Sequence, residues 1–455
     1  MSKEERTIDL NQSINSGSEE FKNLSKDLQG NILAPHGRDN AAHIFVKFEN
    51  QQTARDFING YMVKRITTAA QQKVDSEAFK KGKSKGYRTF ITFSLSMSGY
   101  RFLNVDDKKI PTDSSFKNGM KSKQRQLNDP EFGLWQNEYQ EDWHALIVVC
   151  NKSSKYLNNR VSIIKKELNK ISVKSIYVEI GKGIRNNEGN HIEHFGYVDG
   201  ISQPHMLTDK IDEGKVSVEN WNPKGKLNLA LVPDLGGVGP NSFGSYLVFR
   251  KLDQNVKAFR EAEKKLAEKM QISVDYAGAQ MVGRYRNGTP LIPISPPQPT
   301  SAGEMNDFNF SSDRSTGSKC PFGSHIRKTN QRNSPSPDSA QFPRRGITYG
   351  GNLSKDAESG VGLLFMAYNR NIGGQFEFMQ SAWANSTRFP GGVNSPNGID
   401  SIIGQGNDTG GQAYFKEWGL DSSVVRESKS LGGFVTMKGG EYFFTPSLSF
   451  LKSLK

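Results

Sequence analysis

Cysteine and long apolar runs are both scarce in this chain. Its 455 residues include only two cysteines, Cys150 and Cys320. Two cysteines cannot form a disulfide framework, and they cannot supply a cysteine-based zinc or iron–sulfur site. The longest apolar runs are Ala145–Cys150 and Gly362–Ala367, whereas a membrane-spanning helix needs roughly 20 apolar residues. We therefore expect no membrane partner and no cysteine-bound metal.

The beginning of the chain lacks the features of a targeting peptide. Residues Met1–Leu10 carry acidic side chains and contain no apolar core, which argues against a secretory signal and a mitochondrial presequence. The default expectation is a cytoplasmic protein.

Positive charge is in excess, with 60 Lys and Arg against 47 Asp and Glu and a net charge of +13. Such an excess favours acidic partners or anionic substrates. The lysine-rich segments Lys80–Lys85 and Lys264–Lys269 contain none of the interleaved aromatic residues typical of nucleic-acid binding. We interpret the charge mainly as solvated surface and expect no nucleic-acid partner.

Chain length and turn-forming residues indicate the fold class. A chain of 455 residues exceeds the size at which one core keeps growing, so two domains are expected. The 45 glycines and 19 prolines indicate many turns and long loops, which suits an α+β fold better than a helical bundle.

Hydrophobic periodicity predicts the same order of elements twice. In the first half, strand, helix, strand, strand, helix, strand is the order of a ferredoxin-like domain. The predicted strands are 43–48, 88–95, 144–150 and 173–181, and the predicted helices are 50–67, 96–103 and 153–168. In the second half, strands are predicted at 244–252 and 362–368, helices at 255–270 and 375–383, and extended segments at 433–437 and 442–444.

These patterns predict two ferredoxin-like α+β domains with antiparallel sheets packed together. We place a polar N-terminal extension at residues 1–26, an N-terminal domain at 27–210 and a C-terminal domain at 211–455. A loop rich in Pro, Gly, Ser and Asn spans residues 286–343. Because so long a loop is uncommon inside a compact domain, it suggests a functional site.

Three motifs carry candidate chemistry. In Cys320–Arg332, His325 follows Gly323 and a possible helix N-cap at Ser324, so its ring could be aimed at a ligand. His194–Pro204 contains an Asp-Gly pair typical of a turn, and Pro343–Gly350 contains two adjacent arginines. Taken singly, each motif has an ordinary interpretation. His325 could be a hydrogen-bonded histidine without a ligand, the Asp-Gly pair an ordinary turn, and the two arginines a surface pair.

In combination, the three motifs resemble the dye-decolorizing peroxidases. The resemblance rests on Gly-x-x-Asp-Gly-x-x-Gln-Pro, then the histidine with its arginine-rich tail, then Arg-Arg-Gly-Ile-x-Tyr-Gly, in this order. It extends from about residue 27 onward, through Leu28–Leu33, Gly244–Arg250, Gly362–Phe365 and the segment from 432 to 447. It is closest to the longer subclass with extended loops.

The resemblance implies a haem-dependent peroxidase whose haem b, one per chain, lies in the C-terminal half. The chain contains no Cys-x-x-Cys-His attachment motif, so the haem would be held non-covalently. Hydrogen peroxide would oxidise the haem to a ferryl species, and two one-electron donors, dye-like or phenolic, would restore it. A monomer and a homodimer both remain open.

The resemblance also implies roles for particular residues. His325 would be the proximal iron ligand, Asp199 the distal acid–base residue and Arg344 the distal arginine, with Arg345 as the fallback. Because aspartate has a lower ordinary pKa than the histidine of plant-type peroxidases, roughly 3.9 against 6.5, we expect an acidic pH optimum.

Four further expectations concern the surroundings of the haem. Arg332 would face a propionate, and Arg327 is a weaker candidate. The apolar pair Leu363 and Phe365 would keep the distal side dry, with ordinary core packing as the alternative. His325 should donate its second ring N–H to a carboxylate, for which we select Asp400.

Several other hypotheses remain. The chain could be a haem-binding or iron-handling protein with incidental peroxidase activity, or a haem-free interaction module. His191 and His194 are spaced three apart, but we identify no further ligands that would complete a zinc site. Trp383, Tyr349 and Tyr368 are candidates for radical transfer, although buried structural aromatics are the simpler interpretation.

Overall fold

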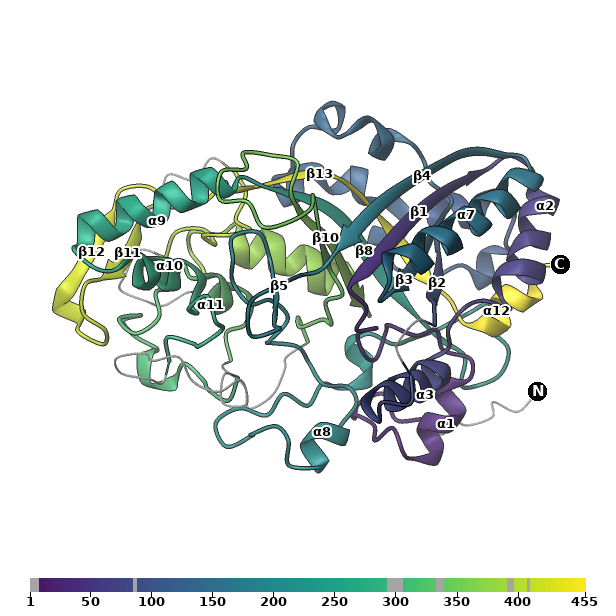
Figure 1. Ribbon diagram of the computed structural model, residues 1–455, viewed down its shortest axis with the longest axis horizontal. Helices are drawn as coiled ribbons and strands as arrows, with labels where there is room; N and C mark the ends of the chain where they lie inside the picture. The colour runs from purple at the N-terminus through teal and green to yellow at the C-terminus, as the bar shows by residue number, and fades with distance from the viewer. Residues whose placement is uncertain (1–7, 85–87, 293–305, 333–338, 391–396, 407–409) are drawn as a thin grey trace.

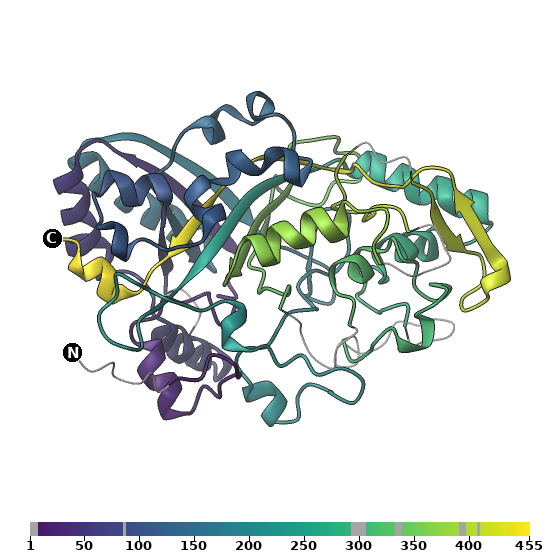
Figure 2. The ribbon, with the colours of Figure 1, turned by 180° about the vertical axis from the view of Figure 1, so that it is seen from behind.

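The computed structural model describes residues 8–84, 88–292, 306–332, 339–390, 397–406 and 410–455 (Figure 1). Its centre is one antiparallel sheet, in which eight strands follow the order β4-β1-β3-β2-β13-β8-β10-β9 and β7 (Val232–Pro233) pairs with β8. Helices α9 to α11 and strands β11 and β12 form one end of the molecule, and α1 and α12, the first and last helices, lie towards the other end (Figures 1 and 2).

The N-terminal half-sheet has the strand order of a ferredoxin-like domain. It consists of β4 (Val173–Lys182), β1 (Asn40–Phe48), β3 (Ala145–Asn151) and β2 (Phe90–Ser96). Every residue of β2 and β3 is buried, and for β3 the continuous apolar run predicts this central position. The crossovers contain α2 (Gln51–Asp56), the π-helical η1 (Phe57–Met62) and α7 (Ser154–Lys170).

The C-terminal half-sheet repeats this order. It consists of β13 (Val435–Thr445), β8 (Phe243–Gln254), β10 (Gly362–Asn369) and β9 (Ile347–Tyr349). Its long helix is α9 (Val256–Met270), and the helix expected over residues 375–383 is present as two π-helical segments, η9 (Gly373–Glu377) and η10 (Met379–Ala384). The expectation of two ferredoxin-like halves is confirmed.

The two half-sheets join at one edge and approach each other at the other. Leu95 and Ser96 of β2 pair with Phe444 and Phe443 of β13. At the opposite edges, the Thr348 hydroxyl donates to the Lys182 carbonyl at 2.6 Å. The sheet therefore curls into a barrel-like layer, and aromatic side chains fill its inner face, among them Phe45 and Phe249 with ring centroids 5.0 Å apart.

The N-terminal segment differs from the expected polar extension. Ile8, Ile14, Phe21 and Leu24 are buried, the last two within α1 (Glu19–Ser25), and Ile14 pairs with Leu207. Residues 8–26 therefore pack onto the body of the protein, whereas residues 1–7 lie outside the described part. The apolar residues of this segment are too few and too far apart to give a helix or strand period in the sequence, although each of those named is buried in the structure.

Two of the longer helices were not predicted, α3 (Ala69–Lys80) and α10 (Val274–Val282). α3 is polar over most of its length, and α10 carries Gly278 in its middle, so neither shows a clear amphipathic stripe. Within the expected loop 286–343, residues 293–305 and 333–338 lie outside the described part.

No helix in the described part of the chain is long and apolar enough to cross a membrane.

The remaining elements are short. The short helices and strands are α4 (Met97–Phe102), α5 (Ser114–Asn118), α6 (Gln124–Leu127), α8 (Asp209–Asp212), α11 (His325–Thr329), α12 (Leu448–Ser453), β5 (Ile184–Arg185), β6 (His191–Ile192), β11 (Gln412–Phe415) and β12 (Val424–Glu427).

Candidate active site

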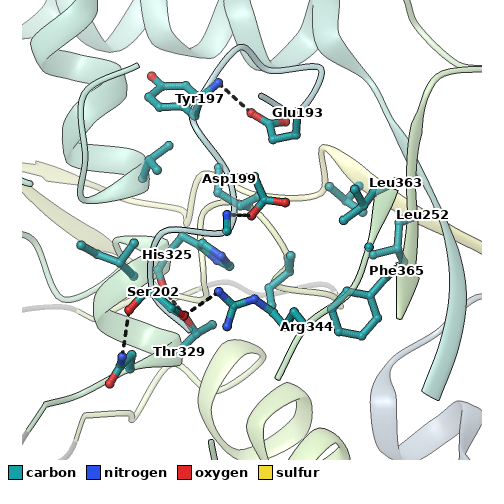
Figure 3. A pocket seen from close by; sticks show the side chains of 18 of the residues that line it. Glu193, Tyr197, Asp199, Ser202, Leu252, His325, Thr329, Arg344, Leu363 and Phe365 are labelled. Carbon is teal, nitrogen blue, oxygen red and sulfur yellow. Dashed lines mark hydrogen bonds between the residues drawn. The ribbon is translucent and has the colours of Figure 1, made fainter. Parts of the chain in front are cut away.

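A cavity of about 220 Å³ lies between the C-terminal half-sheet and the segments that pack over it. A single water needs only roughly 10–15 Å³ by this kind of measure, so the cavity can hold a much larger ligand. Side chains of β8 and β10 line one side, and α11, η10 and the segment from 193 to 202 line the others. In Figure 3, Asp199, His325 and Arg344 surround the same space, with Leu252, Leu363 and Phe365 forming one wall.

His325 is the first residue of α11, and its side chain is 31% exposed, towards the cavity. Ser324 occupies the expected N-cap position with an extended backbone, but its side chain makes no capping hydrogen bond. Its hydroxyl donates to the Gln280 carbonyl in α10 instead. This bond ties the start of α11 to α10, which fixes the direction of the imidazole.

Asp400 lies against His325. The two side chains meet through Nδ1 and Oδ2 at 2.9 Å, and Asp400 is fully buried. The other carboxylate oxygen of Asp400 accepts the backbone N–H groups of Ile402 and Ile403 at 2.8 and 2.9 Å. A carboxylate oxygen accepts in this contact, so in the neutral imidazole the hydrogen lies on Nδ1 and Nε2 keeps its lone pair.

The pKa of His325 reflects two opposing effects. Burial lowers it, but the Asp400 carboxylate and the hydrogen bond to it outweigh burial, so the pKa lies above the ordinary value of 6.5.

Asp199 lines the cavity from the loop after the Tyr197 segment. Its backbone N–H donates to the His191 carbonyl at 3.0 Å, and its Oδ1 accepts the N–H of Gly200 at 2.6 Å. Gly200 has φ of +79°, a conformation that glycine adopts without strain. The chain therefore only bends at the Asp-Gly pair, and the turn of this segment lies at His194 and Phe195. The bend presents the Asp199 carboxylate to the cavity.

The two adjacent arginines point in different directions. Arg344 lines the cavity, where its guanidinium donates to the Ser202 carbonyl at 2.9 Å. Arg345 donates to the carbonyls of Asn31 and Ile32, at 2.7 and 3.0 Å, away from the cavity lining. Burial lowers the pKa of Arg344, an effect that the carboxylate of Asp199 opposes.

The arginines after His325 also differ. Arg332 lines the cavity, donates to the carbonyls of Asn306 and Phe308 at 2.7 and 2.6 Å, and lies 4.1 Å from the ring centroid of Trp221. Burial lowers the pKa of Arg332 well below its ordinary value.

Arg327 is not part of the cavity lining. Its guanidinium forms a buried ion pair with Asp313 at 2.6 Å and lies between aromatic rings, 4.2 Å from the centroid of Phe322. The weaker candidate for a cofactor contact is therefore engaged elsewhere, and its position does not support that role.

The apolar pair Leu363 and Phe365 lines the cavity from β10. On β8, Leu252 pairs directly with Leu363, and all three side chains face the same space. One wall of the cavity is therefore apolar.

Some lining residues were not singled out from the sequence. Ser202 lies inside the Asp-Gly motif and connects Arg344, Arg332 and Asn330 through hydrogen bonds, so the motif itself contained that signal. Glu193, Phe376, Met379 and Val435 come from distant segments whose convergence no local pattern reveals.

The alternative sites have other partners. His191 contacts Arg185, and His194 lies 2.7 Å from the carbonyl of Tyr349. Among the described residues, no group of three or more His, Cys, Asp or Glu side chains could hold a metal ion. The three aromatic candidates for radical transfer, Trp383, Tyr349 and Tyr368, are all buried.

Two family models match most of the chain. Residues 27–183 match the family model of the DyP dimeric alpha+beta barrel domain, and residues 195–389 match the C-terminal model of Dyp-type peroxidases. The chain is 38% identical to the multifunctional dye peroxidase DyP2 of Amycolatopsis sp., over 98% of this chain and all of that protein.

Solved structures of dye-decolorizing peroxidases have the same fold. The crystal structure of a DyP-type peroxidase from Anabaena sp. superposes with a TM-score of 0.91 at 37% identity, with both chains fully covered. A dye-decolorizing peroxidase in complex with 2,6-dimethoxyphenol superposes with a TM-score of 0.77 at 25% identity, over 94% of this chain and 98% of that one. The chain therefore belongs to the dye-decolorizing peroxidases, a family of haem enzymes, and is an oxidoreductase that acts on peroxide.

Proposed function

We propose that this peroxidase holds one non-covalent haem b in the described cavity, with His325 as the iron ligand. The observation that carries the proposal is the convergence of three chemically distinct groups on one space: the imidazole of His325, the carboxylate of Asp199 and the guanidinium of Arg344. Ring nitrogens of neutral histidines are common ligands of haem iron.

The chemistry of the cavity fits such a group. Its walls are apolar at Leu252, Leu363 and Phe365, which suits a flat hydrophobic macrocycle. Arg332 is 6% exposed, and no carboxylate among the described residues is hydrogen-bonded to it, although the charge of Asp307 acts on it at longer range. A buried cation without a directly paired anion is unfavourable, so a propionate beside Arg332 would supply that pairing.

When bound, the haem supplies the electrons that break the peroxide O–O bond. His325 would hold the iron through its Nε2 lone pair, and Asp400 would keep the imidazole in the required tautomer. The hydrogen bond from Nδ1 to Asp400 also raises the basicity of the ring. The protein thereby strengthens the electron donation that favours cleavage.

The other face of the cavity handles protons and charge. The carboxylate of Asp199 takes the proton from the near oxygen of hydrogen peroxide and returns it to the departing oxygen, which leaves as water. The Arg344 guanidinium stabilises the negative charge that develops on the departing oxygen. Leu363 and Phe365 exclude water from this space.

The overall reaction consumes one hydrogen peroxide and two one-electron donors with their protons, and releases two waters and two oxidised donors. We propose aromatic donors, dyes or phenols, because a dye-decolorizing peroxidase of the same fold binds 2,6-dimethoxyphenol.

The test is stopped-flow absorbance of the haem-loaded protein mixed with hydrogen peroxide between pH 3 and 8. We expect a rapid change in the Soret band in the wild type. Asp199→Asn and Arg344→Leu should slow that change while haem stays bound, whereas His325→Ala should lose the haem. A carrier of haem would need only His325 and Arg332. An unchanged Soret band in the wild type, or unchanged rates in both distal variants, would contradict the proposal.

A further inference from the structure

Asp199 is carried by a small hairpin. Residues 191–193 pair with residues 197–199: Asp199 N–H donates to the His191 carbonyl at 3.0 Å, Glu193 N–H donates to the Tyr197 carbonyl at 3.1 Å, and Ile192 bridges Val198. An isolated two-stranded hairpin is marginally stable in water. The direction of the Asp199 carboxylate therefore depends on what holds this hairpin against the rest of the protein.

A buried ion pair holds the turn of the hairpin. Glu263 of α9 is fully buried, and both of its carboxylate oxygens contact Nη2 of Arg286 at 2.8 Å. The Tyr197 hydroxyl donates to the same carboxylate at 2.6 Å. Arg260 adds a second cation 3.3 Å from it.

Arg286 also contacts the hairpin directly, at three places. Its backbone carbonyl accepts the N–H of Val198, the residue next to Asp199, at 3.0 Å. Its Nη1 donates to the Phe195 carbonyl at 3.3 Å, and its guanidinium lies 4.8 Å from the centroid of the Tyr197 ring. The charged head and the backbone of one residue therefore hold both sides of the turn.

The neighbouring backbone is adapted to this arrangement. Gly278 in α10 lies where a Cβ atom would be 2.1 Å from the Tyr197 hydroxyl and 2.3 Å from Oε1 of Glu263. Any side chain at position 278 would displace that hydrogen bond. A buried ion pair is generally a weak source of stability compared with apolar packing, but it can define one arrangement among several.

We propose that the Glu263–Arg286 ion pair, acting through Tyr197 and the backbone of residues 195–198, positions Asp199 for the reaction with peroxide. Glu263, Arg286 and Tyr197 are thus positioning residues and do not exchange protons with the substrate. The inference rests on the proposed role of Asp199. It adds that Asp199 can act only when its carboxylate is held in place by contacts that start at Glu263 of α9, outside the cavity.

The mildest test is Tyr197→Phe, which removes only the hydroxyl between the hairpin and Glu263. Tyr442→Phe is a matched control, because the Tyr442 hydroxyl also donates to a buried carboxylate, Glu377, at 3.0 Å, and Tyr442 does not line the cavity. In the haem-loaded protein, we expect Tyr197→Phe to lower the second-order rate constant for peroxide about tenfold, since small displacements of a reacting group cost large factors in rate. The rate of donor oxidation should not change, and Tyr442→Phe should match the wild type in both steps.

Two further measurements separate positioning from general destabilisation. In an Asp199→Asn background, Tyr197→Phe should have no additional effect on the peroxide step, because its action passes through the carboxylate. Hydrogen exchange of the haem-loaded Tyr197→Phe protein should be faster at the amides of residues 195–200 and unchanged in β10. Gly278→Ala substitutes no residue of the network but crowds its hydrogen bond. It should reproduce both the slower reaction with peroxide and the faster exchange at residues 195–200.

The outcomes distinguish the inference from the function on which it rests. If Asp199→Asn leaves the peroxide step unchanged, the proposed role of Asp199 is wrong. If Asp199→Asn slows that step but Tyr197→Phe and Gly278→Ala both react like the wild type, the function stands and the positioning inference is wrong. An equal loss from Tyr197→Phe with and without the Asp199 carboxylate would also overturn the inference.

Discussion

Replacing Asp400 by asparagine isolates the contribution of one carboxylate oxygen to haem binding. The asparagine Oδ1 can still accept the backbone N–H groups of Ile402 and Ile403, so the local turn keeps its hydrogen bonds. The asparagine NH₂ group would face Nδ1 of His325, where Oδ2 of Asp400 now lies at 2.9 Å. Because two donors cannot share this position, the imidazole must move its hydrogen to Nε2.

The size of the effect follows from that hydrogen bond. A hydrogen bond to a charged group contributes about 1.5–3 kcal/mol. Since about 1.4 kcal/mol corresponds to a factor of ten in an equilibrium constant, the affinity for haem should fall by roughly 10- to 150-fold. The melting temperature of the haem-free protein should change little, because both backbone partners of Asp400 are retained.

The assay is titration of the haem-free protein with haem, followed by Soret absorbance. Glu441→Gln provides a control, because Oε1 of Glu441 accepts the N–H groups of Met120 and Tyr442 and Glu441 is not part of the cavity lining. We expect the control to bind haem like the wild type. If Asp400→Asn binds haem with wild-type affinity and an unchanged spectrum, Asp400 does not act on the iron ligand, and the tautomer argument fails.

Two further predictions concern the paired arginines and the buried histidines. Arg344→Leu should slow the reaction with peroxide about 100-fold. Arg345→Leu should leave that rate intact and lower the free energy of unfolding by about 3 kcal/mol, because buried carbonyls lose their donors. Stopped-flow absorbance and urea unfolding of both variants test this, and the reverse result would exchange the roles of the two arginines. Burial lowers the pKa of His43 and of His144 to about 4 each, below the ordinary 6.5. The folded state thus favours their neutral forms, so their contribution is complete above pH 6.5 and is lost as the pH falls towards 4, by about 1.4 kcal/mol per residue and pH unit. Urea unfolding at pH 7, 6 and 5 should show this loss. His144→Gln should show a smaller loss, reduced by the contribution of His144, because His43 remains and burial also lowers the pKa of His36, to about 3. A free energy of unfolding that does not fall between pH 7 and 5 would contradict the argument.

The order of elements could be predicted from the sequence because each strand carries its own signal. The apolar run of β3, for example, needs no knowledge of its neighbours to indicate a buried strand. The joining of the half-sheets carries no such signal. It depends on two residue pairs between β2 and β13, which lie more than 300 residues apart in the chain. The burial of residues 8–26 was missed for a similar reason, since its apolar residues contact partners far along the sequence.

For the candidate site, the sequence located the residues better than it located their partners. His325, Asp199, Arg344, Leu363 and Phe365 all line one cavity. Their proposed roles remain predictions, to be tested as described above. The surroundings were harder to foresee, because the network that holds Asp199 joins a helix, a loop and a hairpin with no recurring spacing.

Four of the arginines near the site show what a residue type leaves undetermined. Arg327 is neutralised by Asp313, which lies 14 residues earlier, and Arg345 has its guanidinium engaged by backbone carbonyls away from the cavity. Arg332 and Arg344 line the cavity and have no carboxylate hydrogen-bonded to them within the described chain. A guanidinium that already has an anion gains little from another, whereas an unneutralised one in a partly buried site favours an anionic ligand. The partner of each arginine therefore decides which of them can bind a propionate or stabilise a departing oxygen, and that partner is set by the fold.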